Sequence, residues 1–226
     1  MQSPSFTEYL LNATRICDGS CEDLIPGLDA EHMAAVGSHK MHVILTARYL
    51  LGQNFNRPDA MRRMFDHDTS KLQPDERAVY GLMHKMQQVQ DPPLAAHTLV
   101  ARGVDLHRSR NPHHREFWRD AMPAGDLIEA IIDGLACVLE RNPQPTLEHW
   151  LWAYRMEDHA GHGQMETVVE AIKRMYNLAL TANIDYQCLL SMSQCVKVLF
   201  ASPGAWTQHL PWGGGNPAGG SWPPRH

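Results

Sequence analysis

Apolar residues recur along most of the chain at the three- and four-residue spacing of an amphipathic helix. No pair of alternating segments indicates strands, so we expect an all-α protein. Residues 91–112 contain Pro92, Pro93 and Gly103 and are predicted to be less regular. The second predicted helix starts near an N-capping Ser38 and carries Val43, Ala47, Leu50 and Leu51 on one stripe. The other predicted helices cover Phe6 to Cys17, Pro58 to about 65–68, a segment that begins at Pro74, residues 165–179, and Tyr186 to Phe200.

The segment from Asp126 to Glu140 is apolar on nearly all sides, which is typical of a buried central helix. Asp133 lies within it, and Glu129 is one turn earlier on the same side. A buried carboxylate needs a cation or hydrogen-bond donors. Asp133 is therefore either a metal ligand or a paired acid of the core.

A change in composition after residue 202 suggests the domain organisation. We expect residues 1–202 to form a single helical domain and residues 203–226, rich in Gly, Pro and Trp, to be a flexible tail. The alternative is that Trp206, Trp212 and Trp222 dock on the body or on a partner.

Composition excludes several classes of protein. The chain has 226 residues, 43% of them hydrophobic, and a net charge of −5, and it lacks a basic block suited to duplex nucleic acid. No apolar run approaches a membrane span, and no signal-peptide pattern is evident. The five cysteines are odd in number and form no CxxC pair, which favours reduced thiols and a cytoplasmic location.

Histidine is unusually frequent: there are 14, and eight lie between His39 and His114. His39 shares a helix stripe with Val43 and Ala47 and is predicted to point inward. His42 lies about 60° away around the same helix, so it is the weaker candidate. A single histidine on an apolar face is more often a satisfied core residue than a ligand.

The dipeptide His67-Asp68 combines an imidazole nitrogen with a carboxylate oxygen, a pair that suits transition metals better than Ca²⁺. Neighbours on a regular helix point about 100° apart, whereas at a helix end both side chains can reach one centre. Further histidines follow at His97, His107, His113 and His114, and these are either additional ligands or idle loop residues.

In order and type, these elements resemble the HD-domain superfamily of metal-dependent phosphohydrolases. HKMHVILTA, starting at His39, looks like the first-histidine helix of that superfamily, HDTSK looks like its His-Asp-x-x-Lys variant, and DLIEAIIDGLA looks like its last-aspartate helix. The HDxSK, NPHHxxxW and ExxxD motifs together look closer to an uncharacterised branch related to it. The resemblance covers about residues 36–140 and implies an HD-domain-like helical bundle.

The resemblance also implies a ligand set. His39, His67, Asp68 and Asp133 would hold a first divalent transition metal, which is Mn, Fe, Co, Ni or Zn. If a second ion is present, His97, His107, His113 and His114 compete to hold it, and the sequence leaves open whether there are one or two ions.

The implied reaction is hydrolysis of a nucleotide or another small phosphate ester. Asp68 and Lys71 are the expected catalytic residues. Lys71, Arg108, Arg110 and Arg115 are expected to contact the phosphate. Two alternatives remain: an HD-like di-iron oxygenase, and a metal- or nucleotide-binding module without turnover. The partner is expected to be a small phosphorylated molecule, with no membrane and no duplex nucleic acid; the oligomeric state is left open.

Overall fold

The computed structural model describes residues 5–19, 30–118, 122–142 and 183–199, with single residues at 146, 148 and 173. Within these residues every regular element is a helix, which confirms the all-α prediction. The α-helices are α1 (Phe6–Cys17), α2 (Ala30–Leu51), α3 (Pro58–Asp66), α4 (Pro74–Met86), α5 (Leu94–Arg110), α6 (Ala124–Arg141) and α9 (Asn183–Leu199). Short 3₁₀ turns are η1 (Gly52–Asn56), η2 (Thr69–Leu72) and η3 (Arg115–Phe117).

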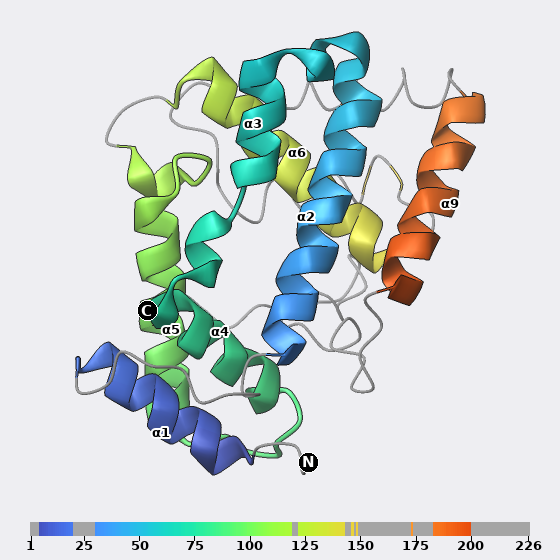
Figure 1. Ribbon diagram of the computed structural model, residues 1–226. Coiled ribbons are helices and arrows are strands. Elements are labelled where there is room, and N and C mark those ends of the chain that lie inside the picture. The colour runs from blue at the N-terminus through green and yellow to red at the C-terminus, as the bar shows by residue number, and fades with distance from the viewer. Residues whose placement is uncertain are drawn as a thin grey trace.

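One half of the described structure is built from α1, α4 and α5, which pack against one another (Figure 1). Its apolar core includes Tyr9 and Ala13 of α1, Leu82 of α4 and Ala96 of α5. The first helix begins with a capping box, in which Ser5 and Glu8 satisfy each other's backbone N–H groups. This fixes the helix start at the predicted residue.

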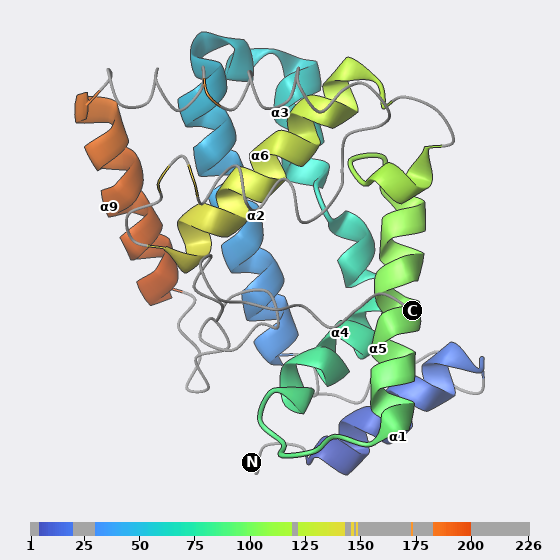
Figure 2. The same cartoon turned by 180° about the vertical axis from the view of Figure 1, so that it is seen from behind.

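The other half contains α2, α3, α6 and α9. Val43 and Ala47 of α2 pack with Met64 of α3 and Ile132 of α6. The helix α9 packs on α2 and also contacts α6. Figure 2 shows α6 crossing α2 at an angle. Residues 129–136 of α6 are all buried, as expected from its apolar sequence. This helix carries Asp133 to the middle of the molecule.

The second helix begins earlier than predicted. It starts at Ala30, and Ser38 lies inside it rather than at its N-cap. The Ser38 hydroxyl instead donates to Glu140 Oε1 at 2.9 Å. Residues 30–37, AEHMAAVG, are mostly good helix formers, and they extend the helix by two turns.

The prediction of an irregular segment over 91–112 is wrong, because α5 is a helix of 17 residues. Pro92 and Pro93 lie before its first turn, where proline does not disturb the helical hydrogen bonds. Gly103 is an interior residue that allows α5 to approach α4 closely: a Cβ there would lie 2.3 Å from Val79 Cγ1. The glycine thus serves packing between helices rather than chain reversal.

Between α3 and η2 the chain breaks at His67 and Asp68. His67 is extended (φ −48°, ψ 132°), and Asp68 adopts the left-handed conformation (φ 55°, ψ 21°). A non-glycine residue in that region is uncommon, although aspartate tolerates it better than most. The break turns both side chains inward, as the sequence predicts for a helix end.

Several predictions lie outside the described residues: the helix over 165–179, the tail at 203–226, and Cys21. Cys17, Cys137, Cys188 and Cys195 are free thiols. Among the described helices, none combines the length and the apolar character needed to cross a membrane.

Candidate metal centre

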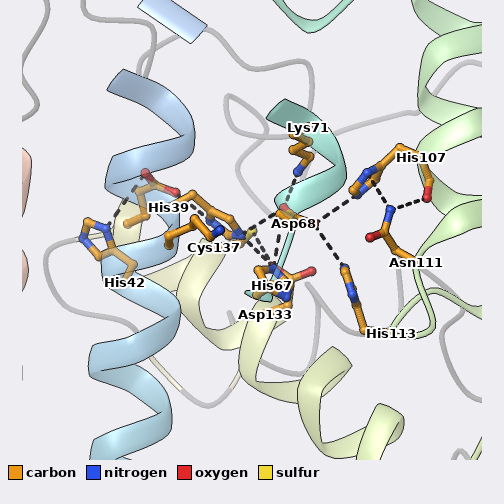
Figure 3. A network of polar contacts seen from close by, with 12 residues as sticks. His39, His42, His67, Asp68, Lys71, His107, Asn111, His113, Asp133 and Cys137 are labelled. Atoms are coloured by element: carbon orange, nitrogen blue, oxygen red, sulfur yellow. Dashed lines mark hydrogen bonds and ion pairs between the residues drawn. The ribbon is translucent and has the colours of Figure 1, made fainter. Parts of the chain in front are cut away.

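A buried cluster of histidines and carboxylates lies where the two halves of the fold meet. Both halves contribute to it, and Figure 3 shows the side chains converging on Asp68. The contributions are His39 from α2, His67 and Asp68 from the break after α3, Asp133 from α6, His107 from α5, and His113 and His114 from the loop that follows α5.

The first group of donor atoms comprises His39, His67 and Asp133, whose ligand atoms lie within 4.8 Å of one another. Asp133 Oδ1 is 3.0 Å from His39 Nε2 and 3.6 Å from His67 Nε2. Asp68 Oδ2 lies beside them, 3.5 Å from His67 Nε2 and 3.8 Å from His39 Nε2. The structure therefore brings together the four residues expected to hold the first ion.

The second group comprises Asp68, His107, His113 and His114, again within 4.8 Å of one another. Asp68 Oδ1 is 3.2 Å from His107 Nε2 and 3.4 Å from His113 Nε2. His114 Nε2 is 3.0 Å from His107 Nε2. Of the four histidines that competed for a second ion, these three lie at the centre, whereas His97 is exposed on α5.

Asp68 contacts histidines of both groups through different oxygen atoms. Oδ2 faces His39 and His67, and Oδ1 faces His107 and His113. Figure 3 shows this carboxylate between the two groups, with Lys71 approaching from a third direction. An aspartate placed in this way can bridge two cations.

Glu129 orients one histidine of each group. Its Oε1 accepts from His67 Nδ1 at 3.0 Å and lies 3.4 Å from His113 Nδ1. Its other oxygen accepts from Arg63 at 3.0 Å, and Arg63 also pairs with Asp126. With the Nδ1 hydrogens directed to Glu129, the Nε2 lone pairs of both histidines point into the centre.

Two more glutamates repeat this arrangement. His39 Nδ1 lies 3.3 Å from Glu140 Oε2, and His107 Nδ1 lies 2.9 Å from Glu76 Oε2. Both glutamates are buried. Metal-binding histidines almost always direct the second ring nitrogen to a carboxylate or carbonyl, which sets the tautomer and raises the basicity of the ligand.

Three atoms at the centre are buried and lack a hydrogen-bond partner among the described residues: His67 Nε2, Asp68 Oδ1 and His113 Nε2. An unpaired buried polar atom destabilises a fold by about 1–3 kcal/mol. Divalent cations bound in the two groups would satisfy all three. The mixture of imidazole and carboxylate donors suits a transition metal, so these residues fit such an ion.

The carboxylates of the centre stay ionised despite their burial. Burial alone would raise the pKa of Asp68, but the adjacent His67, Lys71 and His107 hold that pKa well below its ordinary value. The pKa of Asp133 is likewise low because the adjacent imidazoles of His39 and His67 outweigh its burial. The centre is thus strongly anionic.

Two of the histidines reflect the same excess of negative charge. Burial opposes protonation of His113, yet Asp68 and Glu129 raise its pKa to about 10. The pKa of His39 is raised as well, whereas burial and the neighbouring His113 and His107 lower the pKa of His114. Without a cation, the carboxylates draw protons onto His39 and His113. Bound divalent ions would supply the balancing charge and displace these protons.

A cavity of about 150 Å³ opens beside the centre. His39, Asp68 and Asp133 form one of its walls, and Lys71 lies at its side with Nζ 2.5 Å from Asp68 Oδ2. Arg108 also lines this cavity and pairs with Glu116 at 3.3 Å. A wider cleft of about 930 Å³ also borders the cluster and is lined by His67, His113 and Glu129.

Two of the arginines expected to contact phosphate are engaged elsewhere. Arg110 pairs with Asp75 at 2.7 Å and with Glu76 at 3.4 Å. Arg115 donates to the carbonyl of Trp118. Neither guanidinium is among the residues that line the cavity, so the structure does not support the phosphate-binding roles expected for them.

Sequence reasoning named Glu129 beside Asp133 but gave it no role at the site, and it did not identify Glu76, Glu140 or Arg141, which also lines the cavity. A signal was present for two of them: Glu129 and Glu140 lie four residues before and seven after Asp133, on the same face of α6. Glu76 carried no comparable signal, because its contact with His107 depends on how α4 and α5 pack.

The family profile of a family of unknown function, DUF5662, matches residues 28–175, and the chain belongs to this family. The matched segment contains every residue of the two donor groups. Comparison with curated proteins and with solved structures finds no match.

Proposed function

We propose that this protein hydrolyses small phosphate esters with the help of two divalent transition-metal ions that share Asp68. The observation that carries the proposal is the division of the Asp68 carboxylate between two groups of inward-facing Nε2 atoms. Four of these histidines direct Nδ1 to a glutamate. The resemblance of the HDTSK and DLIEAIIDGLA segments to HD-domain phosphohydrolases supports the same reaction class.

Metal ions in such a centre lower the pKa of bound water and polarise phosphoryl oxygens. His39, His67, Asp133 and Asp68 would hold the first ion. Asp68, His107, His113 and His114 would hold the second. The glutamates behind the histidines keep the donor atoms in place while substrate enters and product leaves.

Lys71 is the residue best placed to act on the phosphate. Its ammonium group contacts Asp68 and faces the cavity, and Asp68 keeps its pKa above the ordinary value despite burial. The charge is therefore permanent and stabilises negative charge that develops on the phosphoryl oxygens. We assign to Asp68 the holding of the ions and the acceptance of a proton from the attacking water.

A metal-reconstitution screen tests this function. Protein stripped of metal and reloaded with Mn²⁺, Co²⁺, Fe²⁺, Ni²⁺ or Zn²⁺ is assayed for phosphate release from a panel of phosphate monoesters. We expect turnover with at least one metal, and a loss of about 10²-fold or more in kcat for Lys71→Met with unchanged metal content.

The matched control is Lys40→Met. Lys40 donates to Thr69 Oγ1 at 3.0 Å and is not among the residues lining the cavity. It should keep wild-type turnover. Phosphate release from no ester with any metal, while the metal is bound, would refute the hydrolase proposal.

A second function, a di-iron oxygenase, is favoured by one observation: the second group offers three imidazoles around one carboxylate, and imidazole is a good iron ligand. Purification under anaerobic conditions distinguishes the two. The oxygenase requires protein that contains iron, develops colour on exposure to air and consumes oxygen. A colourless protein active with Mn²⁺ or Co²⁺ supports the hydrolase instead.

A further inference from the structure

Arg141, the last residue of α6, lines the cavity. It is half-buried, and its Nε is a fully buried donor that has no hydrogen-bond partner among the described residues. Among the described residues it forms no ion pair, in contrast to Lys71 and Arg108, which contact Asp68 and Glu116. A buried guanidinium donor that lacks an acceptor is costly, so a ligand that supplies an anionic oxygen would be bound favourably.

Two of the histidines that line the cavity, His32 and His84, are uncharged. His32 and His84 contact each other, with His32 Nδ1 3.5 Å from His84 Nε2, and His32 Nε2 donates to the carbonyl of Lys71 at 2.9 Å. Burial lowers the pKa of His32 to about 4 and that of His84 to about 3, so both rings are neutral at pH 7. These two rings therefore carry no positive charge that could bind an anionic group in place of Arg141.

The separation of Arg141 from the metal centre limits the ligand to a short molecule. Arg141 follows Asp133 by eight residues, which corresponds to about 12 Å of helix rise. Helical side chains lean toward the N-terminus, so the guanidinium is closer to Asp133 than that. The cavity of about 150 Å³ is also smaller than the roughly 300–1,000 Å³ of pockets for drug-sized ligands.

We propose that Arg141 binds a second anionic group of the substrate, which is therefore a short phosphate ester carrying a carboxylate or another phosphate at its far end. The inference rests on the proposed function, because the first phosphate is held at the metal centre. It narrows the substrate class to short esters that carry a second negative charge. Arg141 is a specificity-determining residue in this account.

Binding of two matched phosphonates tests the proposal without turnover. The probes are 3-phosphonopropionate and propylphosphonate, which differ by a carboxylate in place of a methyl group. Their affinities for Mn²⁺-loaded protein are measured by isothermal titration calorimetry. We expect the carboxylate probe to bind about 10- to 100-fold more tightly, the usual range for a hydrogen-bonded charge pair.

Three variants locate the origin of this preference. Arg141→Gln should reduce it to within about twofold and leave propylphosphonate affinity unchanged, and Arg141→Lys should restore part of it. The control Arg48→Gln removes an exposed arginine of α2 and should behave as wild type. Circular dichroism establishes that each variant is folded.

The outcomes separate the two proposals. Equal binding of both probes to wild type, or a preference that persists in Arg141→Gln because the carboxylate chelates the metal, would overturn the role of Arg141 alone. Failure of both probes to bind metal-loaded protein would overturn the phosphate site, and with it this inference.

Discussion

Glu129→Gln is the substitution that most sharply tests how the centre is supported. Apart from Asp68 itself, Glu129 is the one carboxylate among the described residues that contacts a histidine of each donor group, His67 at 3.0 Å and His113 at 3.4 Å. Glutamine keeps the size and one acceptor oxygen but removes the charge that holds both Nδ1 hydrogens. We therefore expect one substitution to weaken both metal sites.

The magnitude follows from the geometry. Loss of a single carboxylate behind a metal-binding histidine typically lowers metal affinity by about 10- to 100-fold, or about 1.4–2.7 kcal/mol. Glu129 supports one histidine in each group, so the penalty applies to each ion separately. Among the histidines of the two donor groups, Glu140 contacts His39 alone, so Glu140→Gln should weaken only the first site.

Competition with a chromogenic chelator measures both affinities. Asp126→Asn is the matched control: Asp126 lies on the same helix and shares Arg63 with Glu129, but it contacts no histidine among the described residues. It should lower stability without changing metal affinity. Two equivalents of metal bound by Glu129→Gln at wild-type affinity, or an equal loss in Asp126→Asn, would refute the reasoning.

Three other substitutions test the centre, the packing and the buried histidines. Asp68→Ala should abolish binding of both ions, measured by elemental analysis, and equal metal content in wild type and Asp68→Ala would contradict this. The free energy of unfolding of Asp68→Ala should be about 1 kcal/mol lower than that of Asp68→Asn, because asparagine tolerates the left-handed conformation. Gly103→Ala should destabilise the fold by about 1–3 kcal/mol in chemical denaturation, because its Cβ would lie 2.3 Å from Val79 Cγ1. Adding Val79→Ala should recover part of that loss. An unchanged denaturation midpoint in Gly103→Ala would contradict the close contact. Burial lowers the pKa of His84 to about 3. Below about pH 6.5 the unfolded chain therefore binds a proton at this residue that the folded chain does not. As the pH is lowered, His84 reduces the free energy of unfolding by up to about 1.4 kcal/mol per pH unit. Stability curves at pH 7 and 5.5 should therefore be flatter for His84→Met, and identical slopes would contradict a neutral buried His84.

The parts of the fold that follow from local sequence were predicted well. The apolar circumference of α6 and the prolines at the starts of α3 and α4 are local signals, and each element lies where they indicate. Local reasoning was wrong where an apparent breaker serves a tertiary contact. Ser38 resembles an N-cap but donates to Glu140, and Gly103 resembles a chain break but allows α5 to meet α4.

At the candidate site, too, the sequence was sufficient where residue type and order decide, and it was not sufficient where contacts form only on folding. Order and residue type were sufficient to select His39 and Asp133, which the fold brings to within 3.0 Å of each other. The partners of Arg110 and Arg115 were not visible in the sequence, because Asp75, Glu76 and the carbonyl of Trp118 become neighbours only after folding. Contacts behind the ligands likewise depend on helix packing.

The central claim is that two metal ions share the Asp68 carboxylate. Anomalous diffraction from crystals grown with Mn²⁺ tests it most directly, because the signal locates the metal itself. The account predicts two peaks on either side of Asp68, about 3.5–4 Å apart, one near His39 and His67 and the other near His107 and His113. A single peak in one group, or no peak within ligand distance of Asp68, would contradict it.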